Sequence, residues 1–270
     1  MIKKLKTELQ IRGFSEKTIK AYVFHNQRFL DFIKKEPNKI NGDDVKSYMA
    51  YLMAEKKQKP SSVNLVLSAL KFMYQEIMKK RIFDDIKSPK NEKKLPTVLT
   101  RDEIKRMIKA VKNQKHKLLI EFMYSSGLRV SECASIKIQD LNLQEKMGLI
   151  KSGKGKKDRN IILSIKLVSD LTGYVANRND NNPYVFNSKE GHLSIRQAQK
   201  IVHEAAKKAG IKKRVFCHAL RSSFATHLLE NGTDIRIIQE LLGHSNIQTT
   251  ERYTKVSTAQ LKKVISPFDA

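Results

Sequence analysis

The residues best suited to chemistry lie in three short segments of the second half of the chain. Arg129 comes just after a glycine at which one helix is expected to stop and another to start, so its guanidinium stands at an exposed corner. His218 and Arg221 are three residues apart and share one helix face. His244 also follows a helix-ending glycine, and Tyr253 comes nine residues later. A guanidinium suits phosphate oxygens, an imidazole can carry a proton, and a tyrosine hydroxyl can act as a nucleophile.

The charge of the chain points to a polyanionic partner. Lys and Arg number 53 against 27 Asp and Glu, a formal net charge of +26. The excess is spread over the chain, since residues 1–93 carry 21 basic and 11 acidic residues, and the remainder carries 32 and 16. Nucleic acid is the first candidate partner, and both halves could contact it. A lysine-rich surface that is merely solvated is the alternative that charge alone leaves open.

Cysteine content and hydropathy restrict the compartment. The only two cysteines, Cys133 and Cys217, are too few for a disulfide framework or a cysteine-based zinc site, which fits a reducing cytosol. The N-terminal residues lack the apolar core of a signal peptide, and no stretch approaches the roughly 18 to 20 apolar residues of a membrane span. We therefore predict a cytoplasmic protein without a membrane partner.

Apolar periodicity predicts an all-helical domain over residues 1–86. Helices are expected from Ser15 to about Lys34, from Asn41 to Leu52, and from Ser61 to Ile77, with Pro60 as the end of the second. Four tyrosines fall on the apolar stripes and are expected to pack inward rather than stack on bases: Tyr22, Tyr48, Tyr51 and Tyr74. Residues 87–96 have no periodicity and are rich in lysine and proline, which is typical of a linker.

Residues 97–270 are predicted to form a second, mainly α domain with one small β-hairpin. Thr100 and Glu103 make a capping box for its first helix. A Gly/Lys-rich turn separates two short apolar segments, 149–151 and 159–163, which predicts the hairpin. Helices are expected again at three places, each followed by a glycine: 194–209, 218–231 and 234–242.

Taken together, the motifs GLRVSE, GKG, HALRSSFATHLLENG and LLGHSNIQTTERYT resemble the tyrosine recombinase (phage integrase) family, and specifically its compact Xer-type members. The resemblance covers essentially the whole chain. It implies a helical, SAM-like core-binding domain and a catalytic domain that form a C-shaped clamp around double-stranded DNA. It also implies strand cutting and rejoining through a 3′-phosphotyrosyl intermediate, without ATP or metal, by a homo-oligomer that is a tetramer in the synapse. The family's active-site set falls on Arg129, Lys154, His218, Arg221, His244 and Tyr253.

The chemistry of these residue types supports the same reaction. Two arginines can bracket the phosphate, and His218 can accept the proton of the attacking tyrosine. The departing 5′-oxygen needs a proton donor, a role that suits Lys154 at the hairpin tip. Lys151, Lys156 and Lys157 lie near the same tip, and the alternative role of any of these lysines is a phosphate contact. His244 would hydrogen-bond the phosphate or position the tyrosine.

Other residues near the motifs are interpreted as structural. Glu132 is expected to orient or neutralise Arg129, His227 to pack within its helix, and Cys217 to behave as a small buried hydrophobe. The residue after Arg221, often His in the family, is Ser222 here.

The absence of a further N-terminal DNA-binding domain favours the Xer-type resolution of chromosome dimers. A mobile-element integrase, a type IB topoisomerase and a non-catalytic basic DNA-binding regulator remain as alternatives. An apolar stripe at 257–265 is predicted to dock on a neighbouring protomer, with packing on its own domain as the alternative.

Overall fold

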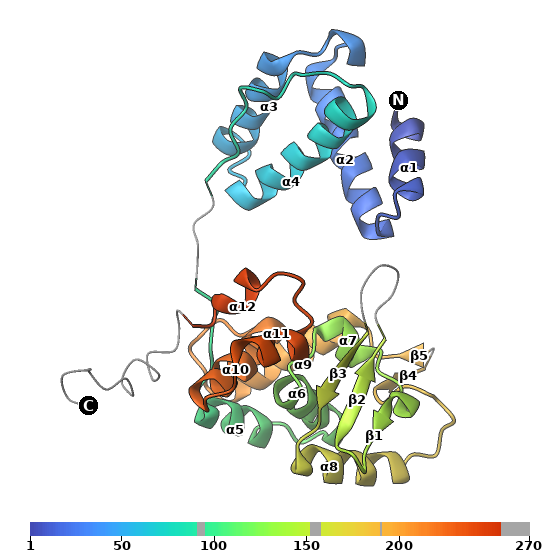
Figure 1. Cartoon of the computed structure of the whole chain (residues 1–270), viewed down its shortest axis with the longest axis vertical. Coiled ribbons are helices and arrows are strands. Elements are labelled where there is room, and N and C mark those ends of the chain that lie inside the picture. The colour runs from blue at the N-terminus through green and yellow to red at the C-terminus, as the bar shows by residue number, and fades with distance from the viewer. Residues whose placement is uncertain (91–94, 152–157, 190, 255–270) are drawn as a thin grey trace, which may run out of the picture. The chain divides into compact units, whose positions relative to one another are not determined.

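Helices make up nearly all the regular structure of the computed structural model, which describes residues 1–90, 95–151, 158–189 and 191–254. The chain divides into two units, Met1–Lys93 and Lys94–Ala270. Figure 1 draws the helices and strands of both units, and each unit has a hydrophobic core of its own. The mainly helical fold class with small antiparallel sheets is confirmed. Among the described residues, no helix has both the length and the apolar character that crossing a membrane requires.

In its described residues, the first unit is a bundle of four α-helices with a short 3-10 turn at Pro37–Lys39 and a π-helical turn at Phe72–Ile77. The helices are α1 (Ile2–Ile11), α2 (Glu16–Ile33), α3 (Gly42–Ala54) and α4 (Pro60–Lys71). The predicted caps are present: the Ser15 hydroxyl accepts the Thr18 N–H at 3.2 Å, and Asn41 forms a capping box with Asp44. The prediction that Pro60 ends the second helix is wrong. Helix α3 ends at Ala54, and Pro60 is the first residue of α4, where its missing N–H costs nothing.

The tyrosines of this unit pack inward as expected. Tyr48 and Tyr74 are buried in its core, while Tyr22 and Tyr51 are partly buried against it. The buried amide of Asn26 donates to backbone carbonyls of α2 and α4, which fixes these two helices to each other. The aromatic side chains therefore stabilise the bundle.

The second unit combines eight α-helices and a 3-10 turn at Ile138–Asp140 with two small antiparallel sheets in the part of the chain that the structure describes. Its helices are α5 (Arg101–Lys109), α6 (Gln114–Ser125), α7 (Val130–Ala134), α8 (Ile165–Ala176), α9 (Ile195–Lys208), α10 (Cys217–Glu230), α11 (Ile235–Leu242) and α12 (Gln248–Glu251). The sheets contain β1 (Leu141–Asn142), β2 (Met147–Ile150) and β3 (Arg159–Ile162) in the order β1-β2-β3, and β4 (Asn187–Ser188) with β5 (Gly191–His192). Strands β2 and β3 form the predicted hairpin, with Ile150 opposite Arg159.

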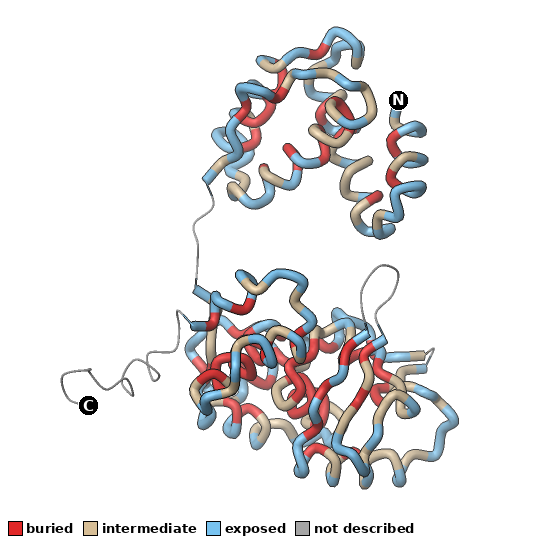
Figure 2. The backbone as a smooth tube through the Cα atoms, in the orientation of Figure 1, coloured by how far each residue is buried: buried red, intermediate tan, exposed pale blue. Residues whose placement is uncertain are grey.

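Helix α10 is the central helix of this unit, and 11 of its 14 residues are buried (Figure 2). Two of its polar residues, Ser223 and His227, contact other parts of the fold through their side chains. The Ser223 hydroxyl accepts the N–H of Leu99 at 2.8 Å, and His227 Nδ1 lies 2.9 Å from the Tyr124 hydroxyl. His227 is thus a packed helix residue, as predicted. A helix so enclosed carries its functional side chains at fixed positions.

Two glycines in the left-handed region make the turns that precede Arg129 and His244. Gly127 has φ +61° and Gly243 has φ +62°. A Cβ on Gly127 would lie 2.3 Å from Phe224 Cδ1, and one on Gly243 would lie 2.7 Å from Arg159 Cδ. Both turns therefore need glycine for the backbone conformation and for the close approach of a side chain.

We expect Gly127→Ala to lower the free energy of unfolding by about 2 to 5 kcal/mol, because strain and a clash with Phe224 add. Gly210→Ala is the matched control: Gly210 has φ +65°, but a Cβ there would meet nothing within 4 Å. The control should lose only the strain, about 1 to 2 kcal/mol. Urea unfolding of the two variants measures the difference, and equal losses would show that the Phe224 contact is unimportant.

Candidate active site

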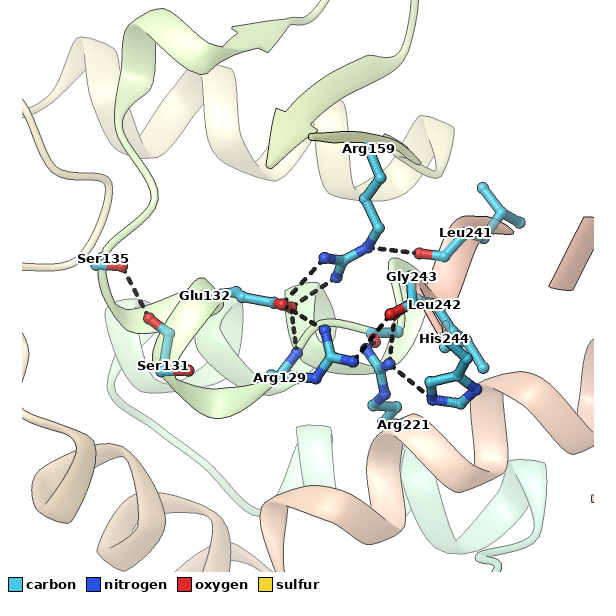
Figure 3. Close-up of polar contacts among 11 residues, drawn as sticks. Arg129, Ser131, Glu132, Ser135, Arg159, Arg221, Leu241, Leu242, Gly243 and His244 are labelled. Carbon is cyan, nitrogen blue, oxygen red and sulfur yellow. Dashed lines mark hydrogen bonds and ion pairs between the residues drawn. The ribbon is translucent and has the colours of Figure 1, made fainter. Parts of the chain in front are cut away.

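Three consecutive carbonyl groups at the C-terminal end of α11 each accept a hydrogen bond from a different arginine (Figure 3). The pairs are Leu241 with Arg159 Nε at 2.9 Å, Leu242 with Arg221 Nη2 at 2.5 Å, and Gly243 with Arg129 Nη2 at 3.2 Å. The last carbonyls of a helix have no amide partner within it, and they form the negative end of its dipole. The end of α11 therefore attracts cations, and it gathers three from separate elements.

Glu132 joins two of these arginines. Its carboxylate accepts Arg159 Nη1 and Nη2 at 3.0 and 2.6 Å, and it also accepts the backbone N–H and Nη1 of Arg129, both at 2.8 Å. Burial raises the pKa of Glu132, but the hydrogen bonds from Arg159 and Arg129 outweigh burial and hold the pKa at about 2. Glu132 is thus ionised and orients Arg129, which agrees with the structural role predicted for it.

Arg221 is the most enclosed of the three arginines, with a relative exposure of 1%. Besides Leu242, its Nη1 donates to the carbonyl of Gly127 at 2.7 Å, across the turn that precedes Arg129. Burial and the charge of Arg129 lower the pKa of Arg221 to about 10. The guanidinium still carries its charge at pH 7.

The contacts of His244 define its tautomer. Its Nε2 lies 3.1 Å from Arg221 Nη2, and because a guanidinium only donates, Nε2 is the acceptor. The proton therefore sits on Nδ1, which donates to the Thr250 hydroxyl at 3.0 Å. Burial and the charges of Arg221 and Arg129 lower the pKa of His244 to about 4. The imidazole is neutral at pH 7.

Tyr253 lies beside this imidazole. Its ring stacks on that of His244 with centroids 6.4 Å apart, and its backbone N–H donates to the carbonyl of Thr250 at 3.0 Å. The side chain is buried, 3% exposed, in a small cluster that includes Phe224 and Leu242. Thr250 thus connects the position of His244 to that of the tyrosine.

His218 lies in the first turn of α10 with its side chain exposed. Partial desolvation lowers the pKa of His218, and the charges of Arg221, Arg252 and Arg129 lower it further. A neutral imidazole has a ring nitrogen that can accept a proton, although the three cations make it a weaker base. The sixth predicted residue, Lys154, lies outside the described residues.

Comparison with known proteins identifies the family. The model of the phage integrase family matches residues 97–260, and that of the phage integrase N-terminal SAM-like domain matches residues 1–84. The chain belongs to the phage integrase family. It is 38% identical to the tyrosine recombinase XerA of Pyrococcus horikoshii over 98% of this chain and 92% of that one. It is 36% identical to the tyrosine recombinase XerD of Listeria monocytogenes, over 95% and 94%.

Solved structures agree. A crystal structure of XerA recombinase matches with a TM-score of 0.58 at 32% identity, over 97% of this chain and 95% of that one. XerH bound to palindromic difH in a post-cleavage complex has the same fold, with a TM-score of 0.79 at 22% identity over 98% and 85%. The predicted resemblance is confirmed: the chain is an Xer-type tyrosine recombinase, an enzyme that cleaves and rejoins DNA.

The site contains two residues that the sequence interpretation missed, Arg159 and Thr250. Arg159 carried a signal, since it is in phase with the buried Ile161 on β3 and therefore faces inward. Thr250 carried none beyond its place three residues before Tyr253. The prediction for Cys217 is confirmed: its side chain is buried, and burial raises the pKa of its thiol to about 11.

The shifted pKa of His244 predicts a pH-dependent stability. The folded state holds this imidazole neutral down to about pH 4, whereas the unfolded chain binds the proton near the ordinary pKa of 6.5. The contribution of His244 to stability is therefore present above pH 6.5 and is lost as pH falls from 6.5 towards 4. We expect this loss to be on the order of 1 to 2 kcal/mol.

His244→Gln provides the test, because the amide can accept from Arg221 and donate to Thr250 but does not titrate. Urea unfolding at several pH values should give a flatter dependence for the variant between pH 6.5 and 4. Identical slopes for the variant and the wild type would contradict the assignment of a neutral His244.

Proposed function

We propose that Tyr253 is the nucleophile of this recombinase. Five residues bind the phosphate, transfer protons or position the tyrosine: Arg129, Arg221, His218, His244 and Lys154. The observation that carries the proposal is the gathering of two arginines and two imidazoles around the turn after α11, with the Tyr253 ring stacked on one imidazole. These groups are the ones that attack on a phosphodiester requires.

The arginines bind the phosphate oxygens and stabilise the charge that develops on them in the transition state. A guanidinium has five N–H donors, and Arg129 uses one on Glu132 and one on Gly243 among the contacts between described residues. Donors therefore remain for a phosphate. Since Arg221 is fixed by Gly127 and Leu242, the site needs little rearrangement to receive the substrate.

Each proton has an acceptor or a donor in this assignment. Forming the phenolate of a free tyrosine at pH 7 costs about 4 kcal/mol, which His218 as proton acceptor and the adjacent cations offset. The Tyr253 oxygen attacks phosphorus, the bond to the 5′-oxygen breaks, and Lys154 protonates that leaving oxygen. The 5′-hydroxyl of another strand then reverses these steps. The phosphotyrosine retains the energy of the bond, so the cycle needs neither ATP nor a metal.

His244 positions these groups from its neutral form. It accepts from Arg221, it donates to Thr250, and Thr250 connects it to the tyrosine. This arrangement supports the positioning role rather than the phosphate contact, because Nε2 carries no proton to donate. The His244 contacts would thus hold Tyr253 and Arg221 in register.

We further propose that the substrate is a specific double-stranded DNA site and that the biological role is the resolution of chromosome dimers in the cytoplasm. The support is the likeness to XerA and XerD along nearly the whole chain, and the binding of the relative XerH to its difH DNA. A tetramer in the synapse follows from the exchange of strands between two duplexes. A mobile-element integrase is the alternative role.

We expect Tyr253→Phe to bind DNA but to form no adduct that survives denaturation, because the ring stays while the attacking oxygen goes. Wild-type protein and variant are incubated with genomic fragments, denatured, and any attached DNA is sequenced. Wild-type adducts at one chromosomal site would support dimer resolution, and adducts at the ends of a mobile element would support integration. An adduct from the variant would exclude Tyr253 as the nucleophile.

We expect Arg129→Ala to lower the cleavage rate about 10²-fold or more, while site affinity changes far less. The charge dependence can be measured with a substrate in which a methyl group replaces one non-bridging oxygen of the scissile phosphate. That methylphosphonate carries no negative charge before attack, so the loss should be much smaller on it than on the normal phosphodiester. Equal losses in affinity and rate would identify Arg129 as an ordinary DNA-binding arginine.

A further inference from the structure

Arg159 is a buried arginine that the proposed catalytic set leaves unused. It opens β3, and its side chain is only 5% exposed. Its guanidinium joins three elements, since two nitrogens donate to Glu132 in α7 and Nε donates to the carbonyl of Leu241 at the end of α11. An arginine enclosed by such partners does not serve as a surface contact for DNA.

The geometry requires the planar fork of an arginine. Both terminal nitrogens reach the two oxygens of one carboxylate, at 3.0 and 2.6 Å, while Nε points to a carbonyl on another helix. A lysine ammonium is a single point charge and cannot span both partners in this way. The packing is equally close, because a Cβ on Gly243 would lie 2.7 Å from Arg159 Cδ and 3.1 Å from Nε.

Arg159 determines how Glu132 is shared. The carboxylate accepts two hydrogen bonds from Arg159 and two from Arg129, so its negative charge is shared between the two arginines. Without Arg159, the partly buried carboxylate of Glu132 would keep only Arg129 as a cationic hydrogen-bond partner among the described residues. Arg129 would then be drawn towards Glu132, and the carboxylate would compensate most of its charge.

We propose that Arg159 is a positioning residue of this recombinase: by binding one side of Glu132 and the end of α11, it leaves the charge of Arg129 only partly compensated by Glu132 and directs this guanidinium towards the scissile phosphate. The inference rests on the proposed function, in which Arg129 binds that phosphate. Arg159 itself acts through Glu132 and touches no substrate. The three arginines and Glu132 together carry a net charge of +2, and the loss of Arg159 halves it.

The test compares Arg159→Met with Arg178→Met. Arg178 is also buried, with 7% side-chain exposure, and it donates to Asp180 and to the carbonyls of Asn182 and Tyr184. Among the described residues, its hydrogen bonds go to residues 180–185 and not to the arginine site. The control therefore loses an equivalent buried guanidinium at a different place.

Covalent adduct formation is measured for each full-length variant on the normal phosphodiester and on the methylphosphonate. For Arg159→Met we expect the rate of phosphodiester cleavage to fall about 10- to 100-fold. Losses of this size are typical when a residue that orients a functional side chain is removed, as known for residues that orient metal ligands. Site affinity should stay within about threefold, since Arg159 contacts no phosphate. On the methylphosphonate the loss should nearly disappear, as for Arg129→Ala. Arg178→Met should cleave both substrates at the wild-type rate.

A purely structural role would lower cleavage of both substrates equally, because misfolding does not depend on the charge of the phosphate, and this result would overturn the proposal. Unchanged cleavage of the phosphodiester by Arg159→Met, beside an active wild type, would overturn it as well. The absence of any wild-type adduct would instead overturn the proposed function.

Arg159→Lys covers the case in which Arg159→Met does not fold. It retains the charge but not the fork, so we expect a smaller loss with the same dependence on the substrate. The double variant Glu132→Gln with Arg159→Met adds a second criterion. If Arg159 acts through Glu132, the double variant should lose no more than the more impaired single variant, and additive losses would contradict the proposal.

Discussion

The site depends on one interaction, the attraction between the C-terminal end of α11 and three guanidinium groups. Leu241, Leu242 and Gly243 present their carbonyls in succession because a helix leaves its last acceptors unpaired. Each carbonyl receives an arginine from a different element, namely β3, α10 and the start of α7. A single helix end thus brings together side chains that the sequence separates by as much as 92 positions, from Arg129 to Arg221.

The scaffold around this end leaves little freedom. Helix α10 is buried along most of its length, so Arg221 is carried at a fixed depth. The left-handed turns at Gly127 and Gly243 place their carbonyls against Arg221 and Arg129, respectively. The positions of the two arginines are therefore set by backbone conformation before any substrate is bound. Such preorganisation is what makes charge stabilisation effective in a transition state.

Local signals account for what the sequence predicted well. Capping residues such as Ser15 and Thr100 begin helices where expected, because a side-chain oxygen satisfies an unpaired amide within three residues. Helix α1 was missed, and its N-cap has no side-chain hydrogen bond. The motif residues were predicted to work together only through a family resemblance. The role of Arg159 was out of reach because its partners lie 27 and 82 positions away, and their approach is a property of tertiary packing.

The clustering of cations has a cost in the free protein. Burial is the larger cause of the lowered pKa values of Arg221 and His244, but the charge of Arg129 lowers the pKa of Arg221 further, and both arginines lower the pKa of His244 further, which indicates repulsion between cations. Among the described residues, Glu132 supplies the carboxylate that accepts hydrogen bonds from the arginines of this cluster. The helix carbonyls add only partial negative charges. In the proposed function, a second carboxylate would stabilise the fold but compete with the DNA phosphate for the same donors. Because the cluster keeps an excess of positive charge, the substrate phosphate would supply the missing anion under this proposal, and binding energy would be gained at the atoms that react.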